Sequence, residues 1–171
     1  ERFRRHILAS RGSAALEQAY DQLKPAPEAS AAQAWFRGYA LLVLAEDAQR
    51  LNAPARADDA YLRAIRALEA SVTAEPSYAD TAHHFIALAL AARARLAQDR
   101  EDSEVAVALI ARAIDTRPES AEWPDGLERT PLGTLRRIRR ELESRGQTAL
   151  LTNLSEDLAV AAPEVWEKSG Y

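Results

Sequence analysis

The sequence of 171 residues contains no cysteine. Without a thiol, the chain can form no disulfide, cysteine nucleophile, zinc–thiolate site or iron–sulfur cluster. It also lacks any apolar run of about eighteen residues, the length that a membrane-spanning helix requires. Glycine occurs only 6 times, and Val, Ile and Thr together occur 19 times, which is too few for a β-sandwich or a barrel.

Alanine and leucine dominate instead, with 37 and 21 copies respectively. Both are strong helix formers, so the composition predicts an all-α protein. A chain of this length is typical of one domain and can bury a core without disulfides or metals. We therefore expect residues 1–171 to form a single all-α domain.

Charge is nearly balanced, with 22 Lys and Arg against 26 Asp and Glu and a net charge of −4. This balance does not favour nucleic acid or an anionic membrane as a partner. Of the cations, 20 are arginine and 2 are lysine, which together with the abundant alanine indicates a GC-rich, bacterial genome. We expect a cytoplasmic protein, or a periplasmic one if a leader before Glu1 has been removed.

Proline, glycine and capping residues divide the chain into seven or eight expected helices joined by short connections. Thr130-Pro131 is the clearest start, because threonine is a good N-cap and proline suits the first helical position. Gly146 is expected as the C-cap of that helix, and Ser155 as the N-cap of a last helix that Pro163 ends or kinks. The other expected helices cover residues 1–9, 14–24, 30–51 and 57–74, and two helices between 77 and 117 separated by the polar residues 98–103.

Two of the expected helices repeat a pattern of small residues. Residues 60–68 (AYLRAIRAL) and 106–114 (AVALIARAI) share two alanines and an arginine at an offset of 46. The helices before them also correspond, with residues 36–39 opposite residues 85–88, and each second helix is followed by a proline. Small residues at a helix crossing let two backbones approach closely, so the pattern indicates packed helical hairpins.

This pattern resembles the tetratricopeptide repeat, a family of about 34-residue hairpins in which an aromatic-then-small first helix precedes an alanine-rich second helix and a proline. Trp35, Gly38 and Tyr39 match the first helix. The resemblance implies antiparallel helical hairpins stacked as a repeat. Its expected parts are a degenerate first hairpin at residues 1–24, two units at residues 30–118, and C-terminal capping helices at residues 130–171.

The resemblance also implies a function, because helical repeats of this kind bind partners on the surface lined by their first helices. A protein or peptide partner is therefore expected, with no catalytic role, cofactor or metal. The first helices are expected to line a groove that suits an acidic peptide, since arginine binds carboxylates while phenylalanine rings contact apolar side chains. We expect Arg93→Glu to weaken binding without unfolding the chain. The implied partner-binding residues are Phe36, Arg37, Val43, Phe85, Ala89 and Arg93.

A second candidate site is a cluster of arginines near the C-terminal end, formed by Arg136, Arg137, Arg139 and Arg140. Such a cluster can bind a phosphate, another anion or an acidic partner. Alternatively, the helix ends the stack, with an apolar seam on one side and charges in water on the other. Nearby glutamates dilute the charge and no aromatic side chains lie among the arginines, so we favour the structural interpretation.

No catalytic motif is visible. The sequence has no G-x-S-x-G, no Gly-rich phosphate loop and no H-E-x-x-H. His83 and His84 are adjacent and point about 100° apart on a helix, so they do not form a metal-binding edge. Three acidic pairs lie near expected helix starts, where the positive end of the helix dipole stabilises negative charge. These pairs are Asp58-Asp59, Glu101-Asp102 and Glu156-Asp157.

Two alternatives to a binding groove remain open. If the C-terminal helices fold back over Phe36 and Phe85, those residues are core, and an enclosed pocket between helices would make the chain a small-molecule or peptide carrier. The second alternative is binding of nucleic acid or an anionic membrane through Arg136 to Arg140, which requires an affinity that falls steeply with salt. The sequence does not indicate an oligomeric state.

Overall fold

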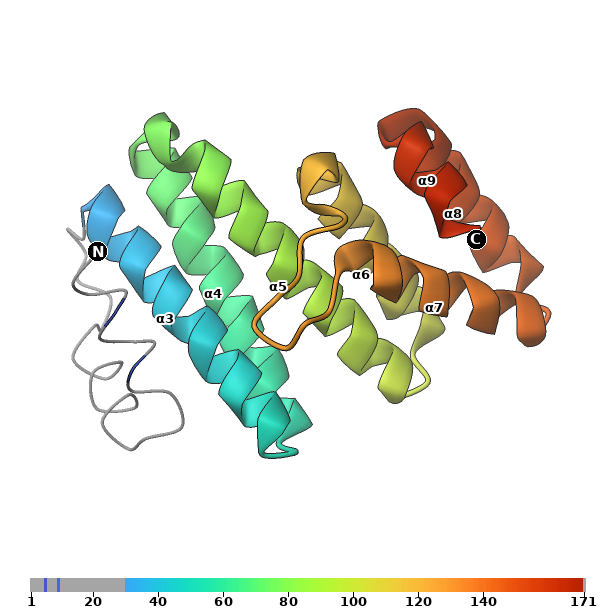
Figure 1. The fold of residues 1–171 in the computed structure, drawn as a ribbon, viewed down its shortest axis with the longest axis horizontal. Helices are drawn as coiled ribbons and strands as arrows, with labels where there is room; N and C mark the ends of the chain where they lie inside the picture. Colours follow the sequence, from blue (N-terminus) through green and yellow to red (C-terminus); the bar gives the residue numbers. More distant parts are fainter. Residues whose placement is uncertain (1–4, 6–8, 10–29, 171) are drawn as a thin grey trace. The chain divides into compact units, whose positions relative to one another are not determined.

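The computed structural model describes Arg5, Ala9 and residues 30–170. Over these residues the chain forms seven α-helices, labelled α3 to α9, and two short 3-10 helices, with no strand (Figure 1). The predicted all-α class is confirmed. Apart from Arg5 and Ala9, the helices expected at residues 1–9 and 14–24 lie outside the described residues. No described helix is both long and apolar enough to cross a membrane.

The contacts of the chain divide it into two compact units, unit 1 up to Ile86 and unit 2 from Ala87 onward. Helix α5 (Ala79–Asp99) contributes its first turns to unit 1 and the remainder to unit 2. The boundary therefore lies inside a helix, and inside the range 30–118 predicted as two repeat units.

Unit 1 contains an antiparallel pair of long helices, α3 (Ala31–Arg50) and α4 (Pro54–Ala74) (Figure 1). Helix α3 begins where predicted, because Ser30 and Gln33 form a reciprocal capping box with hydrogen bonds of 2.8 and 3.2 Å. Helix α4 begins three residues earlier than the predicted start at Ala57, because Pro54 occupies its first position, where a missing N–H costs nothing.

The turn between α3 and α4 is a Schellman motif. Asn52 adopts a left-handed conformation with φ of 54°. Its N–H donates to the Gln49 carbonyl at 3.0 Å, and the Ala53 N–H donates to the Ala48 carbonyl at 2.8 Å. Asparagine tolerates this conformation better than most residues, so the chain can reverse within three residues.

The closest approach of α3 to α4 is at Gly38. A Cβ placed on Gly38 would lie 2.5 Å from Cγ of Leu68 and 3.1 Å from the Ala64 carbonyl oxygen, so the position requires glycine. Further along the pair, the buried Tyr61 donates a hydrogen bond to Oε1 of Gln49 at 3.0 Å. The small residue of the repeat pattern thus lies where the two backbones come together.

Unit 2 contains the second part of α5 and four further helices, α6 (Ser103–Thr116), α7 (Pro131–Ser144), α8 (Thr148–Ala161) and α9 (Pro163–Ser169). Helix α6 packs against α7 and α8, and α7 packs against α8 and α9. Branched aliphatic side chains fill the space between them. The largest fully buried ones are Leu90, Ile110, Ile114, Leu135, Ile138, Leu154 and Leu158.

The caps of unit 2 confirm most of the predicted helix ends. Asp102 caps α6 by accepting the Val105 N–H at 3.3 Å, and Thr130 caps α7 by accepting the Gly133 N–H at 2.9 Å. Gly146, with φ of 65°, lies one position beyond the C-cap of α7 and completes a Schellman motif there.

The predicted start of the last helices is wrong. Ser155 lies in the middle of α8, which begins at Thr148 directly after the Gly146 turn. The preceding turn reverses the chain immediately, and Leu154 and Leu158 then form a continuous buried face, so no break occurs before Ser155. Pro163 begins the short helix α9, since proline suits a first helical position.

Candidate interaction sites

A cluster of aromatic rings joins α3 to the first part of α5 in unit 1. Trp35 stacks on Tyr39, with ring centroids 5.7 Å apart and planes 4° from parallel. Phe85 packs edge-on against these two rings at 5.8 and 5.1 Å, and Phe36 packs edge-on against Trp35 at 5.2 Å. The indole Nε1 donates to Oγ1 of Thr81 at 3.0 Å. Stacked and edge-on rings attract each other, so the cluster holds the two helices together.

The predicted groove residues fall into two groups. Phe36 and Phe85 are half-buried and border the same indole ring, so the structure brings them together. Val43 and Ala89 are 1% and 0% exposed and belong to the core instead of an open surface. They are buried because the middle of α3 and residues 86–92 of α5 are apolar and covered on every side. A partner cannot touch them in this conformation.

The two predicted groove arginines differ in their partners. Arg93 is half-buried and has an interaction within the chain. Arg37 forms no hydrogen bond or ion pair with any described residue, and its Nε is buried without a partner. A buried donor that has lost its water is costly until it meets an acceptor. Arg37 is therefore a cation that no described residue neutralises, and a carboxylate would pair with its terminal nitrogens.

In the arginine cluster of α7, two members hold the C-terminal helix. The guanidinium of Arg136 donates twice to the Lys168 carbonyl, at 2.9 and 3.1 Å, near the end of α9. Arg139 lies 4.3 Å above the ring of Trp166 and pairs with Glu143 at 3.1 Å. The negative end of the helix dipole stabilises the charge of Arg136, and the face of the indole ring stabilises that of Arg139. These two contacts attach α9 to α7.

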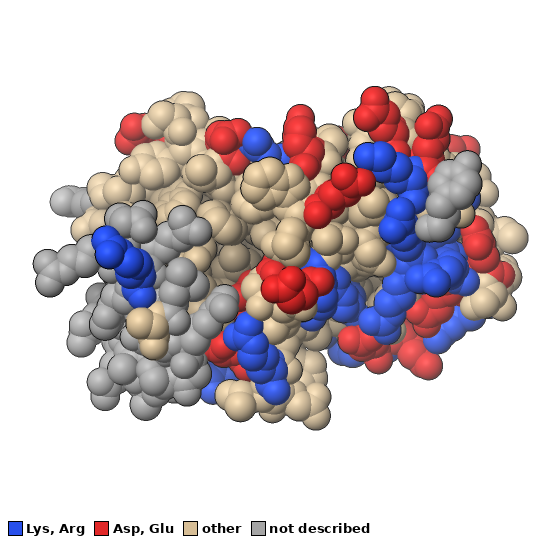
Figure 2. Space-filling view, viewed as in Figure 1, with Lys and Arg blue, Asp and Glu red and all other residues tan. Residues whose placement is uncertain are grey.

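The other two members also have contacts within unit 2. Arg137 pairs with Asp99 at 2.5 Å, and Arg140 donates to the Arg136 carbonyl at 3.3 Å. Figure 2 shows cationic side chains gathered over α7 with acidic side chains beside them. The geometry thus gives each of the four arginines an intramolecular contact, whereas the structural interpretation of the cluster placed these charges in water.

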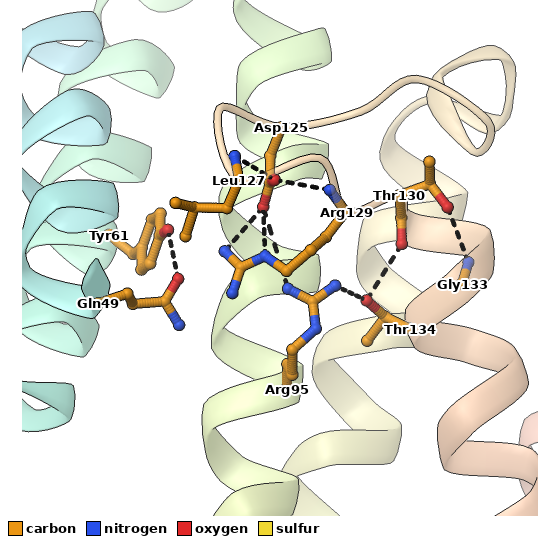
Figure 3. Close-up of polar contacts among 9 residues, drawn as sticks. All are labelled: Gln49, Tyr61, Arg95, Asp125, Leu127, Arg129, Thr130, Gly133 and Thr134. Atoms are coloured by element: carbon orange, nitrogen blue, oxygen red, sulfur yellow. Dashed lines mark hydrogen bonds and ion pairs between the residues drawn. The ribbon is translucent and has the colours of Figure 1, made fainter. Parts of the chain in front are cut away.

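A buried carboxylate organises the loop before α7 (Figure 3). Asp125 accepts backbone N–H groups of Leu127 and Arg129 at 2.8 and 2.9 Å, and the Arg129 guanidinium at 2.8 and 3.0 Å. Arg95 lies 4.0 Å from the same carboxylate and donates to Oγ1 of Thr134. Four donors occupy the acceptor sites of Asp125, so the group fixes the loop and has no free lone pair for acid–base chemistry.

An apolar groove lies between the 3-10 helix η2 (Pro118–Ser120), the start of α7 and helix α9, with a volume of about 370 Å³. Carboxylates and one lysine stand around it. The groove is lined by Pro118, Glu119, Ala121, Glu122, Leu132, Ala162, Pro163, Glu164, Val165 and Lys168.

The sequence prediction did not find this groove. The sequence feature that marks the groove is a pair of Pro-Glu dipeptides, Pro118-Glu119 and Pro163-Glu164, each of which begins a short helix. From the sequence, Pro118 is interpreted as the end of the preceding helix and Pro163 as the end of a helix or a kink in it. The approach of segments 44 or more residues apart depends on how α6, α7 and α8 pack, which local patterns do not specify.

Comparisons of the chain with models of protein families, with curated proteins and with solved structures gave no match. Among the described residues, no group of three or more His, Cys, Asp or Glu side chains could hold a metal ion.

Proposed function

We propose that the chain is a non-enzymatic protein-interaction module, built from helical hairpins stacked in the manner of a tetratricopeptide repeat. The hairpin of α3 and α4 supports this arrangement, because Gly38 meets Leu68 at the close approach that the repeat pattern predicts. A fold of this kind serves many roles, so the binding function has to be argued from a site.

The observation that carries the proposal is the unmatched guanidinium of Arg37. It follows Phe36 on α3, at the edge of the aromatic cluster, and its Nε is buried without an acceptor. The terminal nitrogens of the same guanidinium also form no hydrogen bond with a described residue, and a carboxylate from a partner would accept from them. An apolar neighbour in the same peptide would contact the exposed part of Phe36. The partner is accordingly an acidic, partly apolar peptide segment of another protein.

The test is a peptide-display selection against the folded chain, followed by titration of the selected peptides. We expect the selected peptides to combine Asp or Glu with large apolar residues. Arg37→Glu should weaken their binding about tenfold or more, because it replaces an attractive charge by a repulsive one. The matched control is Arg66→Glu, which changes the net charge identically at an exposed position of α4.

Circular dichroism melting of both variants separates binding from folding, since an arginine without an ion pair should contribute little to stability. If Arg37→Glu and Arg66→Glu weaken binding equally, the effect is one of net charge and the site is elsewhere. If the selection yields no acidic peptides at all, the proposed partner class is wrong.

A further inference from the structure

The groove of unit 2 is a second surface with its own chemistry. Its floor is apolar, formed by proline, alanine, leucine and valine side chains, with Val165 of α9 half-buried and Leu132 of α7 only 4% exposed. Its volume of about 370 Å³ is enough for large apolar side chains of a partner. Trp123, which follows the groove residue Glu122, is 60% exposed, and exposed tryptophan is enriched at protein interfaces.

The charges around this floor are mostly negative. Three carboxylates, of Glu119, Glu122 and Glu164, stand around it together with one ammonium group, that of Lys168. Lys168 pairs with Glu122 at 3.1 Å. Glu119 and Glu164 have no ion pair with any described residue. Figure 2 shows acidic side chains along the edge of unit 2 over η2 and α9. Two uncompensated carboxylates thus border an apolar floor.

The walls of the groove are held in place without a ligand. The Leu132 N–H donates to the Ala121 carbonyl at 2.8 Å, which joins the start of α7 to the residue after η2. The two hydrogen bonds from Arg136 to the Lys168 carbonyl fix α9 on α7. A preformed site does not have to be ordered on binding, so little of the interaction energy is lost.

We propose that this groove docks a basic, apolar segment of a partner protein, with a leucine-sized or phenylalanine-sized side chain on the floor and Lys or Arg beside Glu119 and Glu164. Charge complementarity selects this occupant. An apolar side chain alone would leave both carboxylates without partners, and an acidic segment would be repelled. The site is separate from Arg37 and takes a partner of opposite charge.

The test uses a fluorescein-labelled twelve-residue peptide of alternating lysine and leucine pairs, titrated against the full chain by fluorescence anisotropy. A second peptide with glutamate in place of lysine is the negative control. The wild-type chain should bind only the lysine peptide. Raising the salt concentration should weaken this binding, because charges at the rim are screened.

Three variants decide where the peptide binds. Neutralising both unpaired carboxylates with Glu119→Gln and Glu164→Gln should weaken binding about fivefold or more, whereas Lys168→Gln should strengthen it about twofold because Glu122 is released. Val165→Lys should abolish binding by placing a cation on the floor. Melting curves monitored by circular dichroism establish that each variant is folded.

The matched control is Glu104→Gln with Asp157→Asn, which makes the same change in net charge at two exposed residues that do not line the groove. Equal weakening by this pair and by the groove pair would overturn the proposal, and so would tight binding to the Val165→Lys variant. If the wild-type chain is a dimer that the groove pair dissociates, the occupant is a second copy and the proposed partner is wrong.

Discussion

At the scale of single residues, Gly38 limits how the hairpin of unit 1 can vary. Any larger residue would have to displace Leu68, which is 0% exposed and has no space to move into. We predict that Gly38→Ala destabilises the chain by about 1 to 2 kcal/mol. The free-energy cost of the clash exceeds the stabilisation of about 1 kcal/mol that alanine normally gives over glycine inside a helix. Urea denaturation followed by circular dichroism measures this difference.

A double-mutant cycle identifies the cause. Leu68→Ala alone removes core contacts and should cost about 2 to 5 kcal/mol. In combination with Gly38→Ala, however, it makes room for the added methyl group. The double variant should therefore lose less unfolding free energy than the sum of the losses of the two single variants. Strict additivity would show that the close approach to Leu68 is not what requires glycine.

Asp125 is a second residue on which a larger segment depends. Its side chain is 6% exposed and serves two backbone N–H groups and one guanidinium, with Arg95 also nearby. We predict that Asp125→Ala costs about 3 kcal/mol, since it leaves buried positive charge uncompensated. Asp125→Asn keeps an acceptor for the two N–H groups and should cost less. Thermal melting of both variants tests this order, and equal losses would contradict it.

At the scale of the helices, the turn after α5 contains a residue that is poorly suited to it. Glu101 adopts φ of 61° at the position of a Schellman motif that glycine usually occupies. We predict that Glu101→Gly stabilises the chain by about 0.5 to 1 kcal/mol, because glycine has no Cβ to strain this conformation. Asn52 occupies the equivalent position after α3, with φ of 54°. Asparagine already tolerates this region, so Asn52→Gly should gain less.

Helix ends were predictable where a single residue determines them. Thr130 caps α7 as predicted, and Ser30 and Asp102 cap helices that begin where the sequence places a helix start, since a capping oxygen needs only the N–H groups of the next turn. The start of α8 was missed because its first residues lack a cap and the turn at Gly146 supplies the reversal. Local patterns therefore predict the start of a helix best when a capping residue stands directly before it.

The candidate sites were less predictable than the helices. Phe36 and Phe85, which the repeat pattern places opposite each other, both pack edge-on against the indole of Trp35. The exposure of Val43 and Ala89 was predicted wrongly, because an apolar residue has the same sequence signal in a groove and in a core. Burial depends on what covers a helix, which is a property of the packed chain.

At the scale of the whole molecule, α5 belongs to both compact units. We predict that the units unfold together, because loss of unit 1 removes the contacts that hold the first turns of this shared helix. Gly38→Ala, in unit 1, should then accelerate hydrogen exchange of the most protected amides of α7, in unit 2, by the same free energy as those of α4. Faster exchange confined to α4 would show that the units open independently.

The three-residue turn between α3 and α4 also has a consequence for how the protein is made. It places partners such as Tyr61 and Gln49 only twelve positions apart along the chain. Contacts between residues close in sequence form quickly, typically within microseconds to milliseconds, whereas a ribosome adds about 5 to 20 residues per second. The α3–α4 hairpin can therefore form while α6 to α9 are still being synthesised.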